Sequence, residues 1–276
     1  MSLLRIAAFA DGDQGGNPAG VLIAETLPDA AEMQTIAREL GYSETAFAAP
    51  EGDAWRVRYF APESEVPFCG HATIALGAAL SDKFGEGVYD LILNEAQITV
   101  EGWQDSGRTR AALQSPPTRS EPISDSLLSE VLELFGYSCD DLDSRIPPAR
   151  AHGGADHLVL TLASRQRLAE MRYDLDAGRR LMNREGLVTI LFAWAETTNT
   201  FHTRNPFASG GVYEDPATGA ATAAFAGYLR DLDWPHGGSI HVIQGEDMGS
   251  RSQLQASIPP GRGDSIRVSG TARSLD

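Results

Sequence analysis

The chain has 276 residues with an apolar fraction of 42% and a charged fraction of 22%, which is typical of one or two folded globular domains and excludes a disordered protein. Its 22 basic and 38 acidic residues give a net charge of −16, which disfavours nucleic acid or anionic membranes as partners. No apolar segment approaches the roughly 20 residues of a membrane span, and two cysteines cannot form a disulfide scaffold. We therefore expect a cytoplasmic protein with thiols and no signal peptide.

The first half of the sequence alternates between strand and helix patterns. Asp29 is placed to cap a helix that ends near Leu40, with Gly41 as its stop. Small residues at helical spacing predict a second helix over 70–80, and three prolines indicate a linker at 115–122. Strands are expected at 3–9, 21–24, 55–59, 90–93, 97–100 and 109–114.

The second half continues with mixed elements. Helices are expected near 125–135 and 177–185, and a further helix of small residues is expected over 217–230. Strands are expected at 157–162, 188–194, 200–204, 240–244, 254–258 and 266–268.

One segment of the sequence recurs after a shift of 149 residues. Residues 65–82 read EVPFCGHATIALGAALSD and residues 214–231 read EDPATGAATAAFAGYLRD, and eight of the 18 aligned positions are identical. The shared Glu-x-Pro-x-x-Gly entry favours an internal duplication over two unrelated helix starts of similar composition. Each copy is a loop that leads into a helix, and the side chains of that helix are small enough for strands to pack closely around it.

The start of each repeated helix is suited to bind an anion. The first turn of a helix carries unpaired backbone N–H groups and the positive end of the helix dipole, and both favour a carboxylate. Titratable groups lie at the same places: Cys69 and His71 in the first copy, Glu214 and Asp215 in the second. Such groups suit proton transfer at carbon. Two bases on opposite faces would permit racemisation or epimerisation, and one shuttling base would permit allylic isomerisation.

Four segments, in this order, resemble one known family. They are GNPAG at 16–20, YSETAF at 42–47, RYFAPESEVPFCGHAT at 58–73 and GGVYEDPATGAA at 210–221. Together they resemble the PhzF-like proteins, a family named for the phenazine-biosynthesis isomerase, which shares the diaminopimelate-epimerase fold. The similarity covers essentially the whole chain.

The resemblance implies an α+β fold of two pseudo-symmetric domains, each a β-barrel-like sheet around a central helix, with the active site between them. We place the first domain at 1–117 joined by 264–276, and the second at 118–263. The resemblance also implies a homodimer, a biosynthetic role, a small anionic substrate, and neither a metal nor an organic cofactor.

The resemblance further implies roles for individual residues. In the phenazine enzyme, a glutamate in the SET segment shuttles a proton during isomerisation of trans-2,3-dihydro-3-hydroxyanthranilate, and Glu44 matches it. The family's other catalytic positions match His71 and Asp215, which would position the substrate and relay protons. The residues expected to bind substrate, through side chains or backbone N–H groups, are Ser43, Gly70, Thr218, Gly219 and Ala220.

The sequence departs from the family at Ala220, where the phenazine enzymes commonly carry a serine that contacts substrate. This difference leaves the substrate open. Diaminopimelate epimerase uses a cysteine at each of the two helix starts, and only Cys69 is present here, so a two-thiol epimerase is excluded. A racemase or epimerase with Cys69 facing Asp215, and a binding protein that has lost turnover, are the alternatives to an isomerase.

Each candidate also has a purely structural interpretation. Glu44 could be a surface carboxylate at a strand edge, His71 could pack at a helix start, and Asp215 could be an N-cap. Cys69 could be a small buried apolar residue. Asn17 is expected to shape a turn, with contact to the site as the alternative. His152 and His157 lack a carboxylate at metal-ligand spacing, so no zinc site is expected there.

Overall fold

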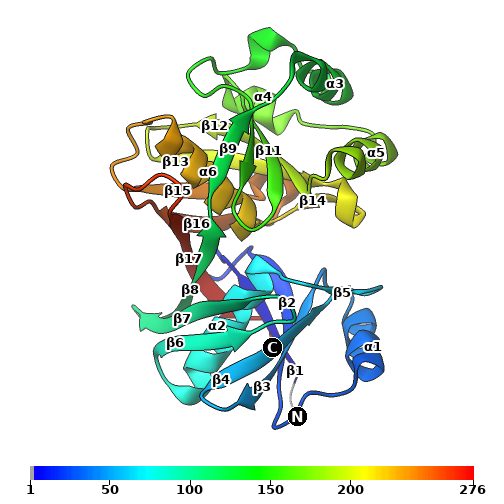
Figure 1. Cartoon of the computed structure of the whole chain (residues 1–276), viewed down its shortest axis with the longest axis vertical. Helices are drawn as coiled ribbons and strands as arrows, with labels where there is room; N and C mark the ends of the chain where they lie inside the picture. Colours follow the sequence, from blue (N-terminus) through cyan, green and yellow to red (C-terminus); the bar gives the residue numbers. More distant parts are fainter. Residues whose placement is uncertain (1–2) are drawn as a thin grey trace. The chain divides into compact units, whose positions relative to one another are not determined.

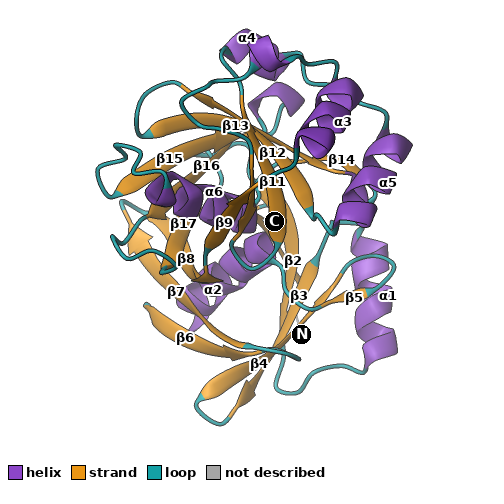
Figure 2. Cartoon of the chain, turned by 45° about the horizontal axis from the view of Figure 1, so that its top comes forward, coloured by secondary structure: helices purple, strands orange, loops and turns teal. Residues whose placement is uncertain are grey.

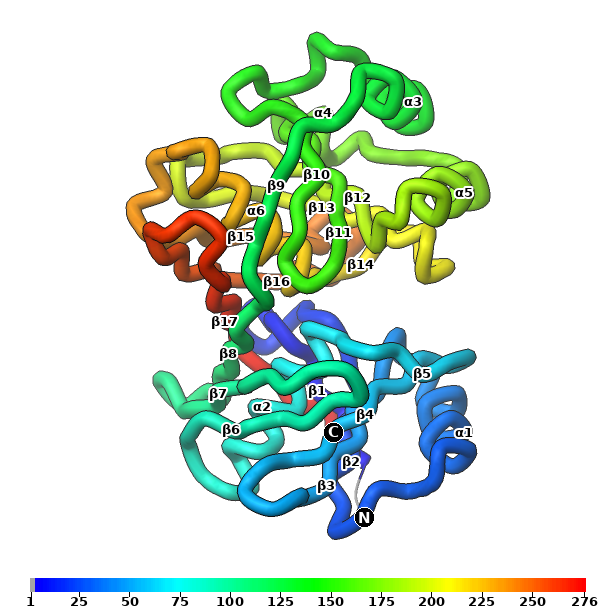
Figure 3. Tube along the Cα trace, in the orientation of Figure 1, coloured from blue at the N-terminus to red at the C-terminus, as the bar shows by residue number. Residues whose placement is uncertain are grey.

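The computed structural model describes residues 3–276 and divides the chain into two compact units. Unit 1 comprises the chain up to Gln114 together with Ser269–Asp276, and unit 2 is Ser115–Val268. The chain passes from unit 1 to unit 2 within β8 (Arg108–Pro117) and returns within β17 (Ser265–Ser274), as Figure 3 shows. The fold is a mixed α+β fold dominated by sheet (Figure 1).

Unit 1 is built on strands that pair mostly with their neighbours in sequence. β1 pairs with β2, β3 with β4, β4 with β5 and β6 with β7 in antiparallel fashion, whereas β2–β3 and β4–β6 are parallel. β17 pairs with β1, so the last strand of the chain lies beside the first. The strands are β1 (Leu3–Ala8), β2 (Asn17–Ile23), β3 (Thr45–Glu51), β4 (Ala54–Phe60), β5 (Glu65–Val66), β6 (Gly87–Ile92) and β7 (Gln97–Asp105).

Two helices complete unit 1. α1 (Ala30–Leu40) begins where the Asp29 carboxylate accepts a hydrogen bond from the Glu32 amide at 2.8 Å, and it ends at Gly41 in the left-handed region, as the sequence predicts. α2 (Gly70–Phe84) is buried from its second residue through Ser81 and contacts β1, β2, β3, β6 and β7. Small side chains make α2 thin enough for strands to pack on several of its sides.

Unit 2 repeats the strand order of unit 1. The pairs β10–β11, β12–β13, β13–β14 and β15–β16 are antiparallel, and β11–β12 and β13–β15 are parallel. In unit 1 the short strand β5 pairs with β4 and leads into α2, and in unit 2 the short strand β14 pairs with β13 and leads into the second helix of small residues. The strands are β9 (Arg119–Pro122), β10 (Ala149–His152), β11 (Asp156–Thr161), β12 (Thr189–Ala195), β13 (Thr200–Phe207), β14 (Val212–Asp215), β15 (Ser239–Gln244) and β16 (Ser252–Ser257).

The helices of unit 2 lie on both sides of these strands. α6 (Gly219–Asp231) is buried along most of its length and contacts β9, β10, β11, β15 and β16. Figure 2 shows α3 (Asp125–Phe135), α4 (Arg165–Ala169) and α5 (Leu175–Glu185) at the outer side, where they enclose a second apolar core. Short 3₁₀ turns lie at Cys139–Asp141, Ala208–Gly210 and Glu246–Met248.

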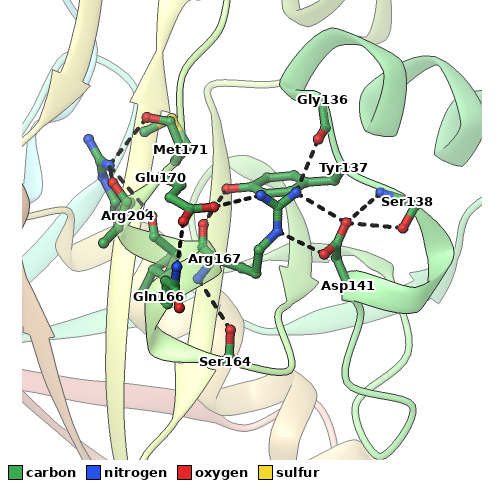
Figure 4. Close-up of polar contacts among 12 residues, drawn as sticks. Gly136, Tyr137, Ser138, Asp141, Ser164, Gln166, Arg167, Glu170, Met171 and Arg204 are labelled. Carbon is green, nitrogen blue, oxygen red and sulfur yellow. Dashed lines mark hydrogen bonds and ion pairs between the residues drawn. The ribbon is translucent and has the colours of Figure 1, made fainter.

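An arginine on α4 fastens the outer part of unit 2. Arg167 Nε donates to the Asp141 carboxylate at 2.7 Å, its Nη2 donates to the Gly136 carbonyl at 3.1 Å, and its guanidinium lies 4.9 Å from the centre of the Tyr137 ring (Figure 4). The Arg167 guanidinium holds the pKa of Asp141 below its usual value. This cluster joins α4 to the segment that follows α3.

Two expectations about chain segments need correction. The expected linker at 115–122 begins where the chain passes from unit 1 to unit 2, but it has strand conformation: it is the end of β8 followed by β9, which pairs with β10. The described pairing of β8 with β7 ends at Leu113, so Pro116 and Pro117 do not interrupt that ladder. Asn17 lies in β2 opposite Ala8 and is buried rather than in the turn, because the turn ends before it.

The described residues contain no helix that is both long enough and apolar enough to cross a membrane. Among the same residues no disulfide joins Cys69, which is buried, to Cys139, which is exposed.

Candidate functional site

A carboxylate, an imidazole and a thiol meet at the start of α2 in unit 1. Glu44 Oε2 lies 3.4 Å from His71 Nε2, and Cys69 Sγ lies 3.4 Å from His71 Nδ1. The Ser43 hydroxyl lies 3.3 Å from His71 Nε2. The structure thus brings together four of the residues that the sequence singles out, in one group around the imidazole.

Glu44 is largely buried and not on the surface. Its side chain is 12% exposed, and its Oε2 atom is buried without a hydrogen-bond partner among the described residues. The Glu44 carbonyl accepts a hydrogen bond from the Gly20 amide at 3.2 Å, at the point where β3 begins beside β2. The interpretation of Glu44 as a surface carboxylate is therefore wrong, since the strand start holds its side chain against His71.

The first turn of α2 is held by a buried tyrosine. Cys69 is the N-cap residue of α2, and Thr73 Oγ1 donates to the Cys69 carbonyl at 2.7 Å. The hydroxyls of Thr73 and Tyr59 lie 2.7 Å apart, and burial raises the pKa of Tyr59, which therefore stays neutral. Tyr59 lies on β4, so it ties the helix start to the sheet. The sequence carries no signal for this role, because nothing local links positions 59 and 73.

This group can perform two kinds of chemistry. A carboxylate next to an imidazole can accept and return a proton, and the N–H groups at the start of α2 can stabilise negative charge on a substrate. The ligand atoms of Glu44, Cys69 and His71 also lie within 4.8 Å of one another, so these residues could hold a thiophilic metal ion such as Zn²⁺.

In unit 2, Asp215 is the last residue of β14, and the turn that follows it leads to Thr218 and α6. Thr218 Oγ1 donates to Asp215 Oδ2 at 2.5 Å, and Thr218, not Asp215, is the N-cap residue of α6. The interpretation of Asp215 as the N-cap of this helix is therefore wrong. Gly219 and Ala220 are the first two helical residues, which places their N–H groups in the unpaired first turn, as expected.

A buried glutamine fixes this turn from the neighbouring strand. Gln244, at the end of β15, is fully buried. Its Oε1 atom accepts from the Thr218 amide at 3.1 Å, and its Nε2 atom donates to the Asp215 carbonyl at 2.7 Å and to Thr218 Oγ1 at 2.9 Å. Gln244 thus satisfies three polar groups of the Asp215–Thr218 turn.

The glutamate beside Asp215 has a structural partner. Arg204 Nε donates to Glu214 Oε1 at 3.0 Å, and both side chains are buried. Arg204 Nη1 also donates to the Ala169 carbonyl at 2.9 Å and the Met171 carbonyl at 3.3 Å, the second of which Figure 4 shows. Glu214 is therefore bound to β13 and is not a candidate acid or base.

Unit 1 contains the same ion pair at the same place. Arg58 on β4 donates from Nε and Nη2 to the two carboxylate oxygens of Glu65 at 2.7 and 2.6 Å, and the Arg58 guanidinium holds the pKa of Glu65 below its usual value. Glu65 and Glu214 are the first residues of the repeated motif. In each unit this glutamate fastens the short strand before the central helix.

A family model described as phenazine biosynthesis-like protein matches residues 6–275. A curated relative from Mesorhizobium japonicum, named an uncharacterized isomerase, is 29% identical over 276 residues and covers 93% of this chain and 91% of its own. A solved structure of a phenazine biosynthesis protein of the PhzF family from Bacillus anthracis has a TM-score of 0.87 at 21% identity, and the match covers 99% of this chain and 96% of that one.

The fold extends beyond that family. The structure of a probable proline racemase from Agrobacterium radiobacter has a TM-score of 0.66 at 13% identity, with 99% of this chain and 90% of that chain covered. At such identity the likeness is one of fold. The two proteins share a mixed α+β fold dominated by sheet.

Proposed function

The chain belongs to the family of phenazine biosynthesis-like proteins and is an isomerase, and on that premise we propose that it moves a proton between carbon atoms of a small carboxylate-bearing metabolite without a cofactor. The observation that supports this most strongly is the Glu44 carboxylate, whose buried Oε2 atom faces His71 at 3.4 Å and has no hydrogen-bond partner among the described residues. An oxygen of this kind is placed to accept a proton from substrate.

In the proposed reaction Glu44 removes a proton from a carbon next to an unsaturated or carbonyl group and returns it to another carbon. His71 orients the carboxylate and can relay the proton. The Ser43 hydroxyl contacts His71 Nε2, the same nitrogen that faces Glu44. The Gly70 N–H group and the positive end of α2 would stabilise the negative charge that develops on the substrate. The C–H bond that breaks gives its electron pair to the new double bond, and the old double bond gives its pair to the C–H bond that forms, so the step balances without a further reactant.

Gly219 and Ala220 are proposed to hold the anionic end of the substrate through their backbone N–H groups, with Thr218 beside them, whereas Asp215 is proposed to position the substrate and relay protons. Support comes from the first turn of α6, which starts at Gly219 directly after the Thr218 amide that Gln244 engages. An alanine at position 220 keeps the backbone N–H of the family's serine and loses its hydroxyl. This difference leaves the identity of the substrate open.

The proposal extends to assembly and architecture. We propose that 1–117 with 264–276 and 118–263 are separate domains, each a barrel-like sheet around α2 or α6, and that the protein acts as a cytoplasmic homodimer in a biosynthetic pathway. The strands around each helix support the architecture. Light scattering tests the assembly: a mass of about twice the 29.6 kDa chain supports the dimer, and the mass of one chain contradicts it.

A racemase or epimerase remains the second candidate because of Cys69. Its Sγ atom lies 3.4 Å from His71 Nδ1, close enough for the imidazole to take the thiol proton. In that reaction Cys69 would be one base and Asp215 the other.

Incorporation of solvent deuterium tests the function and separates the two candidates. The protein is incubated in D₂O with cyclic and acyclic amino and hydroxy carboxylates, including dihydro-hydroxyanthranilate, and exchange is read by mass spectrometry. The isomerase predicts exchange that Glu44→Gln abolishes and Cys69→Ser retains. Exchange lost in Cys69→Ser and retained in Glu44→Gln would establish the epimerase. Ligand binding without exchange in any variant would contradict both.

A further inference from the structure

A pocket in unit 1 lies near the opposite end of α2 from the Glu44–His71 group. Its volume is about 470 Å³, and all of its lining residues belong to unit 1. Lys83 at its rim follows His71 by twelve residues on the same helix, a distance of about 18 Å along the axis. The pocket is therefore separate from the proposed site of proton transfer and needs a ligand of its own.

The inner surface of this pocket is apolar. It is formed by Leu4 and Ile6 of β1, Ala78 and Ala79 of α2, and Ala272 of β17. The volume is within the range of about 300–1,000 Å³ found for small-molecule sites, and an apolar lining with a few polar groups is their usual composition.

The rim of the pocket carries three cations, Lys83, Arg108 and Arg273. Lys83 makes no ion pair in the part of the chain that the structure describes, and its ammonium lies 5.3 Å from the centre of the Phe84 ring. Arg273 Nε is buried without a hydrogen-bond partner among the described residues, and its Nη2 donates to the Gly15 carbonyl at 3.3 Å. Lys83 and Arg108 are therefore the cations that can donate to an anion in the pocket, whereas the Arg273 guanidinium is engaged at the Gly15 carbonyl.

The two carboxylates at the rim each have partners of their own. Asp82 Oδ1 accepts from Gln104 Nε2 at 2.9 Å and from Thr109 Oγ1 at 2.7 Å. The side chain of Asp13 is 91% exposed and lies 3.5 Å from Arg108 Nη2, so this pair is held loosely in water. In a chain with a net charge of −16, Lys83 and Arg108 are the charges at this rim that an anionic ligand can engage.

We propose that this pocket binds an amphipathic monocarboxylate, a small molecule with one carboxylate group and an apolar body about the size of a medium-chain fatty acid. The apolar body would cover the surface formed by β1, α2 and β17, and burial of that surface would drive binding. The carboxylate would accept hydrogen bonds from the Arg108 guanidinium, which matches its geometry, with Lys83 adding charge. Binding here does not depend on the proposed proton transfer.

The sequence provides a specific reporter for this pocket, because Lys83 is its one lysine. Reductive methylation with ¹³C-formaldehyde labels Lys83 and the terminal amine and leaves the lysine charged. Titration with octanoate is expected to shift the Lys83 methyl resonance saturably, with a Kd of about 1 mM or below. A shift that does not saturate by about 10 mM would overturn the proposal.

Two comparisons test the chemistry. Arg108→Gln should weaken octanoate binding about tenfold or more, whereas Arg119→Gln, which removes a comparably exposed arginine in unit 2, should leave the Kd unchanged. 1-Octanol should bind at least about tenfold more weakly than octanoate. Equal Kd values for the two ligands, or equal effects of the two substitutions, would contradict a carboxylate site. A resonance that moves with protein concentration alone would instead identify a second copy of the chain as the occupant.

Discussion

Gln244 stabilises the turn before α6, and no motif in the sequence predicts this role. It follows Thr218 by 26 residues and lies at the end of β15, yet it makes three hydrogen bonds to the Asp215–Thr218 turn. The loop motif predicts Asp215 and Thr218, because their spacing relative to the helix start is local. It cannot predict Gln244, since only the parallel pairing of β15 with β13 places that side chain beside the turn.

Replacing Gln244 should disturb the turn more than the fold. Gln244→Ala leaves the Thr218 amide and the Asp215 carbonyl without their partner, so we expect the KM to rise about tenfold with a smaller change in kcat. Amide hydrogen exchange at Thr218 should accelerate in the same variant. Gln255→Ala, which removes an exposed glutamine from β16, is the matched control. An unchanged KM and an unchanged rate of amide exchange at Thr218 would show that the turn keeps its conformation without Gln244.

His157 makes the stability of the protein depend on pH. The ring is fully buried with Nδ1 2.8 Å from Thr189 Oγ1, and burial lowers the pKa of His157 from 6.5 to about 3. Below pH 6.5 the unfolded chain binds a proton that the folded chain does not, so this histidine makes stability fall as the pH falls toward 3.

Urea unfolding at pH 7 and pH 5 measures this effect. Between these values the free energy of unfolding of the wild type should fall by about 2 kcal/mol more than that of His157→Gln. Equal losses in both proteins would mean that His157 is protonated in the folded state.

At the scale of elements, the sequence predicts helices better than strands. Asp29 and Gly41 mark the ends of α1, and α3 spans the expected residues, because caps and periodicity are local signals. β3 was not predicted, since its sequence TAFAAPE is rich in alanine and carries few β-branched residues. Its strand conformation comes from pairing with β2 and β4, and this pairing is what buries the adjacent Glu44.

The close approach of α2 to β7 depends on glycine. A Cβ atom at Gly102 would lie 2.5 Å from the Gly77 carbonyl oxygen, whereas one at Gly87, its partner across the β6–β7 pair, would meet nothing within 4 Å. Gly102→Ala should therefore lower the free energy of unfolding by about 1–3 kcal/mol, and Gly87→Ala should change it by less than about 0.5 kcal/mol. Denaturant unfolding checks both, and equal effects would mean that α2 can move away at no cost.

At the scale of the whole chain, the repeated motif and the repeated strand order support one duplication. The sequence repeat covers only 65–82 and 214–231, but the order of parallel and antiparallel pairs recurs through both units, as does the ion pair formed by Glu65 or Glu214. The sequence could predict the family, because four motifs kept their order. It could not predict the ion pairs, which depend on the antiparallel pairing of two neighbouring strands, or Gln244, which depends on a contact between segments 26 residues apart.

The central claim is that Glu44 moves the proton. The most direct test is the rate of deuterium incorporation into a turned-over substrate by Glu44→Gln, beside Glu51→Gln as a control at the exposed end of β3. Our account predicts a loss of about 100-fold or more in Glu44→Gln and an unchanged rate in Glu51→Gln. A Glu44→Gln rate within about tenfold of the wild type would contradict it and would assign the base to another group.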